Sequence, residues 1–477
     1  MKEKLYLEYL IYCLFFIVST YIVENNKFFQ IDEISKIYVR FAFVSKIVAG
    51  LLLWFIYTYY YSNTKISDIY KYFEDGNTMA TILKNDISDF IKIITGKLPT
   101  NGINKTLYHD LKFWTKPNSY GIYNDNQTII LFNCILSILS NNNLITSLLI
   151  ISFLSFTASI ALYKVLSPYL TLKKTYFSIL FLTPSIALWT SGLLKESIIF
   201  ISVVGCVYHG IKVLEKLEIK RVVFFISSCF LLLISKTYLL GFLLPTIICT
   251  ILISFLKTSK IRTLFYCIYV VFILFFISWS LTHNPVSYDY KNKTESEKKK
   301  EYDRVNHISY TQNVLGNNYN ILEMLRFKQA DYKHEAKIEK AKSLIWTKKM
   351  DGRMINLIAC IPFGLSNGFA RPHIFEINSF MISIPAIENF IIILLFVFSI
   401  FFSSKLDPKK QLIVYGFGTF ITLTYLFLGL LVPVLGNLVR YKAPLLPLLY
   451  FCILIQIDNK KLKHFWRKIK RNKNAYL

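Results

Sequence analysis

A series of long apolar segments constrains this chain more than any other feature of its sequence. A helix that crosses a bilayer needs about 20 predominantly apolar residues, and runs close to that length recur from one end of the chain to the other. With 54% hydrophobic residues and a mean hydropathy of +0.43, too little polar surface remains to cover an ordinary soluble domain. We therefore predict an all-α, polytopic transmembrane helix bundle.

The predicted spans number about 11, within a range of about 10 to 13, because several of the apolar runs are short. They cover residues 5–23, 41–61, 144–166, 175–190, 193–213, 222–235, 237–256, 263–281, 386–403, 412–431 and 443–457. Residues 129–139 form an apolar run of a length more typical of an interfacial or re-entrant helix. If that run does not cross, residues 62–127 face the outside, and if it does cross they are cytoplasmic.

Basic residues beside the spans predict the orientation of the bundle. Residues 459–473 carry eight Lys or Arg directly after the last span, and an excess of such residues marks the cytoplasmic side. Counting spans backwards places four more basic segments on that side, at 405–410, 257–262, 215–221 and 173–174. The C-terminus is therefore predicted to be cytoplasmic, and residues 283–385 and the turn 433–442 to lie outside.

The pattern divides the chain into six segments. They are N-terminal spans (1–61), an outer loop with juxtamembrane helices (62–143), a central span bundle (144–282), a long outer loop (283–385), C-terminal spans (386–458) and a basic cytoplasmic tail (459–477). Within the long outer loop we expect a solvated charged helix over 291–304 and a helix of mixed charge over 323–349.

Composition and motifs disfavour several classes of function. The net charge of +26 would suggest a nucleic-acid partner in a soluble protein, but many of the cations lie in short loops and in the tail, so we predict none. The eight cysteines fall almost entirely inside apolar runs, which predicts buried side chains without disulfides or zinc. Motifs for nucleotide hydrolysis, dinucleotide binding, serine hydrolases and zincins are absent, and no cofactor or metal is predicted.

A break in an apolar run, at residues 183–197, is the leading candidate for a functional site. Pro184 lacks the N–H group that a continuous helix needs, and Gly192 loosens the following turn. Lys195 and Glu196 then begin the next apolar segment. Ionisable residues at membrane depth persist mainly where they face a bundle interior or a wet cavity. The alternative is a plain turn, with Lys195 reaching the headgroups and Glu196 favoured at a helix N-terminus.

An acidic group follows the second span. Asp68, Glu74 and Asp75 lie in the segment SDIYKYFEDGNTMA, and a carboxylate above a bilayer can act as a general base on a hydroxyl group. The alternative is an amphipathic juxtamembrane helix with a solvated acidic face.

A cationic group lies in two later segments, FARPHIFE and GNLVRYKAPLLP, which contain Arg371, Arg440 and Lys442. Arg440 stands out because the count of spans places it at the outer end of the last span, opposite to the usual side for basic residues. An outward Arg and Lys suit the phosphate or diphosphate of a lipid carrier. Binding of ordinary anionic headgroups is the alternative.

These segments resemble known membrane proteins. TPSIALWTSGLLKESIIF is similar to a segment of GT-C-type polytopic glycosyltransferases in which an acid lies at the outer end of a span. SDIYKYFEDGNTMA is similar to their first outer loop through Asp68 and Tyr70, with Asp75 as an alternative match. The chain departs from that superfamily in lacking Asp-x-Asp and in having two predicted spans before the acidic loop.

Two further segments resemble membrane proteins of bacterial surface-polysaccharide clusters. One reads Arg-Pro-x-x-x-Glu, with Arg371 and Glu376 at its ends and His373 inside it. The other reads Arg-Tyr-Lys-x-Pro and begins at Arg440.

The resemblance implies sugar transfer at the outer face of a bacterial cytoplasmic membrane, from a polyprenyl-phosphate or diphosphate donor. The acceptor hydroxyl would be deprotonated by Asp68 or Asp75. Glu196 would orient the acceptor or the base, and Lys195 would pair with it or reach the phosphate. Arg371, Arg440 and Lys442 would hold the leaving group, and His373 and Glu376 are further candidate substrate-binding residues. A polysaccharide polymerase, a transporter or flippase, and a membrane scaffold remain alternatives; besides the lipid-linked sugar, membrane lipids are the expected partners.

Overall fold

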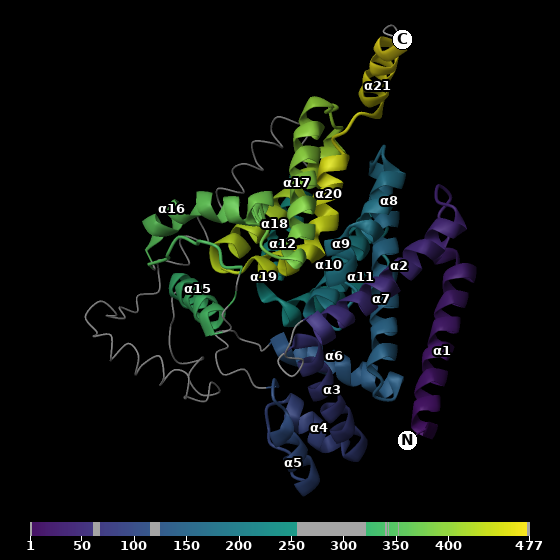
Figure 1. Cartoon of the computed structure of the whole chain (residues 1–477), viewed down its shortest axis with the longest axis vertical. Helices are drawn as coiled ribbons and strands as arrows, with labels where there is room; N and C mark the ends of the chain where they lie inside the picture. The colour runs from purple at the N-terminus through teal and green to yellow at the C-terminus, as the bar shows by residue number, and fades with distance from the viewer. Residues whose placement is uncertain are drawn as a thin grey trace.

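The computed structural model describes residues 2–60, 67–114, 125–254, 321–338, 341, 343–351 and 353–474. Within these ranges the chain is helical and has no β-strand, which confirms the predicted all-α fold class (Figure 1). The predicted span 263–281 and the charged segment 291–304 lie outside the described residues.

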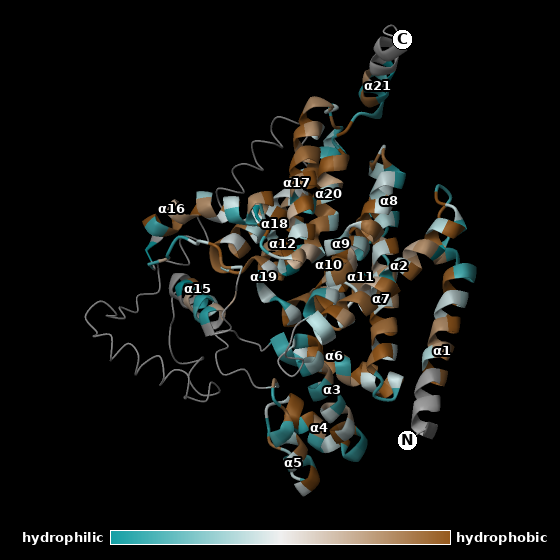
Figure 2. Cartoon of the chain, viewed as in Figure 1, coloured by the Kyte–Doolittle hydropathy of each residue, from teal (hydrophilic) through white to brown (hydrophobic). Residues whose placement is uncertain are grey.

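Five helical segments are long and apolar enough to cross a membrane. They are Lys36–Tyr60, which joins α2 (Lys36–Phe55) to η2 (Ile56–Tyr60), Leu144–Tyr169, which extends α7 (Leu144–Leu166), α10 (Lys195–Glu215), α17 (Phe380–Phe401) and α18 (Pro408–Leu431). Shorter apolar stretches lie in α1 (Lys2–Asn25) and α12 (Thr237–Ser254), and a third runs from Ile355 to Ala370 through α16 (Met354–Leu365). In Figure 2 the hydrophobic residues of these helices are coloured brown. The chain therefore has the character of a membrane protein.

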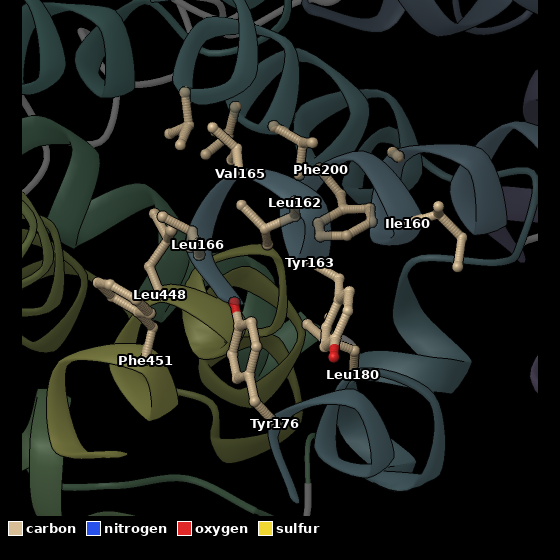
Figure 3. Packing of buried hydrophobic residues seen from close by; sticks show 14 of the residues in the cluster. Ile160, Leu162, Tyr163, Val165, Leu166, Tyr176, Leu180, Phe200, Leu448 and Phe451 are labelled. Carbon is tan, nitrogen blue, oxygen red and sulfur yellow. The ribbon is translucent and has the colours of Figure 1, made fainter. Parts of the chain in front are cut away.

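A buried aromatic cluster joins the helices at the centre of the bundle. The rings of Tyr163 in α7 and Tyr176 in α8 (Lys173–Leu182) stack at 6.3 Å between centroids, and Phe177 meets Tyr163 edge-on at 5.3 Å. Phe451 of α20 (Leu446–Leu454) lies 6.1 Å from Tyr176. Figure 3 shows Tyr163, Tyr176 and Phe451 in one cluster with Phe200 of α10. Aromatic packing thus ties the central and C-terminal helices together.

The break at Pro184 divides what we predicted as one span over residues 175–190. α8 ends at Leu182, Thr183 is extended with φ −68° and ψ 115°, and Pro184 occupies the first position of α9 (Pro184–Trp189). Proline is well tolerated at that position because its missing N–H would have no helical partner. The predicted break at Pro184 is confirmed, and it divides the apolar run 175–190 between two helices.

A membrane-depth carboxylate stabilises the start of α9. Glu388 of α17 accepts a hydrogen bond from the backbone N–H of Ser185 at 2.8 Å, and it also contacts the Ser185 hydroxyl. One of the free N–H groups at this helix end is thus satisfied from a neighbouring helix. Glu388 therefore connects α17 to the break.

The first predicted outer loop is a layer of helices. It contains α3 (Asp68–Asn85), α4 (Ile87–Ile94), α5 (Gly102–Asp110) and α6 (Asp125–Ser140). Gly76 allows α3 and α6 to touch, because a Cβ atom at that position would lie 2.6 Å from the Cβ of Asn133. Residues 129–139 form part of α6, which packs along α3.

The described segments of the long outer loop return to the bundle. α15 (Ile321–Ile338) covers only part of the helix that we predicted over 323–349, because residues 343–349 are not helical. The chain after it pairs with the segment before α19 (Leu435–Lys442), since the Ile345 N–H donates to the carbonyl of Pro433 at 2.7 Å. Gln329 of α15 also donates to the carbonyl of Leu430 at 2.7 Å. The loop thus covers the entry to α19.

The last helix continues beyond the bundle. α21 (Asn459–Asn474) contains the basic tail, and Figure 1 shows it at the opposite end of the long axis from α4 and α5. The distance between α21 and these helices makes the predicted sidedness testable.

Cysteine labelling tests the orientation. In a variant without native cysteines, we expect a membrane-impermeant maleimide to modify Lys97→Cys in intact cells but to reach Lys409→Cys only after permeabilisation. Both lysines are exposed, so access to the side chain is not limiting. The reverse pattern of labelling would contradict the predicted cytoplasmic C-terminus.

Candidate functional site

Six charged side chains from distant parts of the chain meet between the helical layer and the bundle. We call them the junction cluster, and they are Asp68, Asp125, Lys195, Glu196, Lys236 and Arg440. Asp68, Asp125 and Lys195 are the first residues of α3, α6 and α10, and Lys236 separates α11 (Ile219–Ser235) from α12. The N-termini of α3, α10 and α12, each with free N–H groups and partial positive charge, therefore lie near this cluster.

Arg440 is the centre of the acidic half of this cluster. Its Nη1 donates to Asp68 Oδ2 at 2.6 Å, and its Nε lies 2.8 Å from Glu196 Oε1. The arginine side chain is only 9% exposed, whereas Asp68 is 30% exposed. Asp68 is thus the member of this trio that faces solvent.

Glu196 has an incomplete set of partners. It is 1% exposed, and among the described residues neither of its carboxylate oxygens accepts a hydrogen bond. The close approach to Arg440 Nε is an ion pair whose geometry does not make a hydrogen bond, and that N–H also lacks an acceptor. Buried polar atoms are normally hydrogen-bonded, so both oxygens of this carboxylate can still accept hydrogen bonds.

The basic half of the cluster is centred on Asp125. Lys195 Nζ lies 2.9 Å from Asp125 Oδ1, and Lys236 Nζ lies 2.5 Å from Asp125 Oδ2. Lys195 also donates to the side-chain carbonyl of Asn126 at 2.6 Å. Because Lys195 and Glu196 are neighbours in sequence, the two halves of the cluster adjoin.

Aromatic rings surround the charges. The Arg440 guanidinium lies 5.9 Å from the centre of the Trp189 ring, and Lys195 lies 5.4 Å from that of Tyr72. Lys236 lies 5.6 Å from the ring of Tyr441. Such cation–π contacts stabilise partly desolvated cations, and the rings give the site flat apolar walls.

The two candidate bases on α3 have different surroundings. Asp75 accepts hydrogen bonds from the backbone N–H groups of Lys112 at 3.1 Å and Phe113 at 2.7 Å. Burial raises the pKa of Asp75 above its ordinary value, against the effect of these bonds. Burial also acts on Asp68, but the charge and hydrogen bond of Arg440 outweigh it and lower the pKa of that carboxyl. Asp75 fixes a loop, and Asp68 belongs to the junction cluster.

The other residues of the acidic segment have structural contacts. Glu74 forms an exposed ion pair with Lys112 at 3.3 Å. The Tyr70 hydroxyl accepts a hydrogen bond from Trp54 Nε1 at 3.1 Å, which ties α3 to α2.

The segment FARPHIFE forms a separate group of contacts near the end of α19. Arg371 Nη1 lies 2.9 Å from Glu376 Oε1, and the backbone N–H of His373 donates to Glu376 Oε2 at 2.9 Å. Lys442 donates to the backbone carbonyls of Gly368 at 2.9 Å and Arg371 at 2.6 Å. Lys442 therefore fixes this backbone to the end of α19, and none of its described contacts reaches the junction cluster.

The structure thus brings together Asp68, Lys195, Glu196 and Arg440 of the candidate residues. Sequence reasoning missed Asp125 and Lys236 as members of the site. Lys236 carried a usable signal, because it is a single charge between two apolar runs, where ionisable residues are functional candidates. Asp125 carried none, since acidic residues beside asparagines are typical of turns.

Two further properties of the described residues concern ligands. No group of three or more His, Cys, Asp and Glu side chains is placed to hold a metal ion. A cavity of about 220 Å³ lies beside the loop between α1 and α2, where its lining includes Glu24, Asp32 and Arg40, and no junction residue lines it.

Comparison with known proteins finds no match to a protein-family model, to a curated protein or to a solved structure.

A double-mutant cycle tests the burial of Arg440. We expect Arg440→Met to lower the free energy of unfolding by about 3–5 kcal/mol, because it leaves buried carboxylates unpaired. Adding Glu196→Gln should restore part of the loss, since one of those charges is then removed. Thermal unfolding of the purified protein measures both. Arg353→Met is a matched control that breaks an exposed Arg–Asp pair and should cost at most about 1 kcal/mol. Additive effects of the two junction substitutions would mean that the residues do not interact.

Proposed function

We propose that this chain is a membrane glycosyltransferase that uses a sugar linked to a polyprenyl phosphate or diphosphate, at the outer face of the bacterial cytoplasmic membrane. The observation that carries the proposal is the trio of Asp68, Glu196 and Arg440. It combines a partly exposed carboxylate, a buried carboxylate with unfilled oxygens and a buried guanidinium. These are the groups that transfer from a phosphate leaving group to a hydroxyl needs.

Asp68 is the proposed general base. Its carboxylate would accept the proton of the acceptor hydroxyl as that oxygen bonds to the anomeric carbon. At the same time the bond from that carbon to the phosphate oxygen breaks, and the carrier phosphate leaves. Asp68 is partly exposed whereas Arg440 and Glu196 are buried, so an acceptor can reach Asp68 from solvent, which supports this role.

Arg440 is the proposed phosphate holder, and its pairing with Asp68 couples the two roles. While the guanidinium faces Asp68, it lowers the pKa of that carboxyl and makes it a weak base. A carrier phosphate that binds the guanidinium draws it towards the ligand, and the basicity of Asp68 then rises. Donor binding would thereby activate the base.

Glu196 is proposed to orient the acceptor. Its two oxygens lack donors in the described chain, and sugar hydroxyl groups are donors of the right kind. The Trp189 ring beside Arg440 offers an apolar face of the sort on which a sugar ring can rest.

Matched substitutions on α3 test the base. We expect Asp68→Asn to lower turnover by about 10²–10⁴-fold with donor affinity little changed. Asp75→Asn alters the same residue type on the same helix, but its carboxylate binds backbone N–H groups, so it should lower thermal stability and retain turnover. Turnover is measured on purified protein with a polyprenyl-linked sugar donor. Wild-type turnover of Asp68→Asn would remove the general-base role and favour a polymerase mechanism centred on arginine.

Substitutions of the other two residues separate donor from acceptor binding. Arg440→Lys should weaken donor binding and recover only part of the function lost in Arg440→Ala, because lysine lacks the planar fork of donors. Glu196→Gln should raise KM for the acceptor and lower turnover while the protein level stays unchanged. Equal donor affinity in wild type and Arg440→Ala would contradict the assignment of the phosphate site.

A further inference from the structure

Two lysines share a single carboxylate in the basic half of the junction cluster. Lys195 and Lys236 contact the two different oxygens of Asp125, at 2.9 and 2.5 Å. Their side chains are 9% and 16% exposed, and that of Asp125 is 19% exposed. The three groups together carry a net charge of +1 and are not sealed from solvent.

The helix ends increase this positive character. Asp125 and Lys195 begin α6 and α10, and Lys236 directly precedes α12. An acid is favourable at a helix N-terminus, but a lysine there opposes the partial positive charge of its own helix. Both lysines therefore occupy positions that disfavour a cation. A negative group at this place is stabilised by the lysines and by the helix ends alike.

The basic half also adjoins the proposed phosphate site. Lys195 precedes Glu196, whose carboxylate lies beside Arg440, and Tyr441, the residue after Arg440, lies against Lys236. The charge of Lys195 also acts on Asp68, the carboxylate that Arg440 binds, so the lysine pair lies close to the proposed phosphate site. An anion longer than one phosphate would extend from Arg440 towards the lysine pair.

We propose that Lys195 and Lys236 bind the second phosphate of a diphosphate carrier. Asp125 pairs with both lysines in the absence of the carrier, and the phosphate displaces it on binding. This inference rests on the proposed function and narrows its donor to a lipid-linked diphosphate. A compact ammonium group is a strong partner for phosphate oxygens, and release from Asp125 leaves both lysines available to one ligand.

Binding of soluble carriers to the full-length protein tests the inference. The probes are farnesyl diphosphate and farnesyl monophosphate, titrated against protein in nanodiscs of uncharged phosphatidylcholine. We expect the diphosphate to bind at least about tenfold more tightly, the scale of one charge-assisted hydrogen bond. Lys236→Ala should remove that preference, and Lys236→Arg should keep most of it.

Asp125→Asn tests whether the Asp125 carboxylate is displaced by the phosphate or only supports the structure. Removing the carboxylate that competes with the ligand should tighten diphosphate binding, whereas loss of a purely structural residue would weaken it. Lys220→Ala, at an exposed lysine at the start of α11, should change nothing. Equal binding of the two probes to wild type, or weaker binding to Asp125→Asn, would overturn the inference.

Two further arms identify the source of the phosphate and separate this inference from the proposed function. Nanodiscs with anionic phosphatidylglycerol should leave diphosphate binding intact; its complete loss would assign the site to ordinary headgroups and overturn the inference. Turnover with a monophosphate-linked donor that is unaffected by Lys236→Ala would refute the diphosphate site and leave the transferase standing. Diphosphate preference without sugar transfer from any donor would instead remove the proposed function.

Discussion

The guanidinium of Arg440 depends on two carboxylates that come from other parts of the chain. A buried charge is tolerated only when paired, and a buried charge left with no partner is strongly destabilising. Asp68 opens the helical layer and Glu196 follows the break in the bundle, while Arg440 precedes the last apolar helix. This ion pair network therefore fixes the layer, the break and the C-terminal helices relative to one another, and the site exists only when all three are in place.

The charges of the junction cluster balance, with three acids and three bases, but they are unevenly distributed. Arg440 lies between two carboxylates, and Asp125 lies between two ammonium groups. One half is therefore short of positive charge and the other half is short of negative charge. An acceptor hydroxyl complements the carboxylates of the first half, and a carrier diphosphate that extends from Arg440 to the lysine pair complements the second. A transport path for a simple ion has no need of such a division, which supports the proposal of group transfer between two substrates.

The fold class and four of the six junction residues were predictable from the sequence, because apolar length and isolated charges are local signals. Asp68, Lys195, Glu196 and Arg440 stand out as charges beside apolar runs, and the structure places them together. The choice between Asp68 and Asp75 was not predictable, since they lie two helical turns apart on one face of α3. Only tertiary packing turns one towards Arg440 and the other towards the backbone of residues 112–113. The pairing of Asp125 with two lysines depends in the same way on how α6, α10 and α12 meet.

The segment that carries Glu196 is held by polar contacts from three neighbouring helices. Glu388 of α17 binds Ser185, Lys46 of α2 donates to the Thr190 hydroxyl at 2.6 Å, and Ser152 of α7 donates to the Ser191 carbonyl at 3.1 Å. Polar groups at this depth lack water as an alternative partner, so such contacts are hard to give up. The break is therefore a fixed element and not a hinge. A carboxylate mounted on it keeps its position without a ligand, which is the preorganisation that electrostatic catalysis requires.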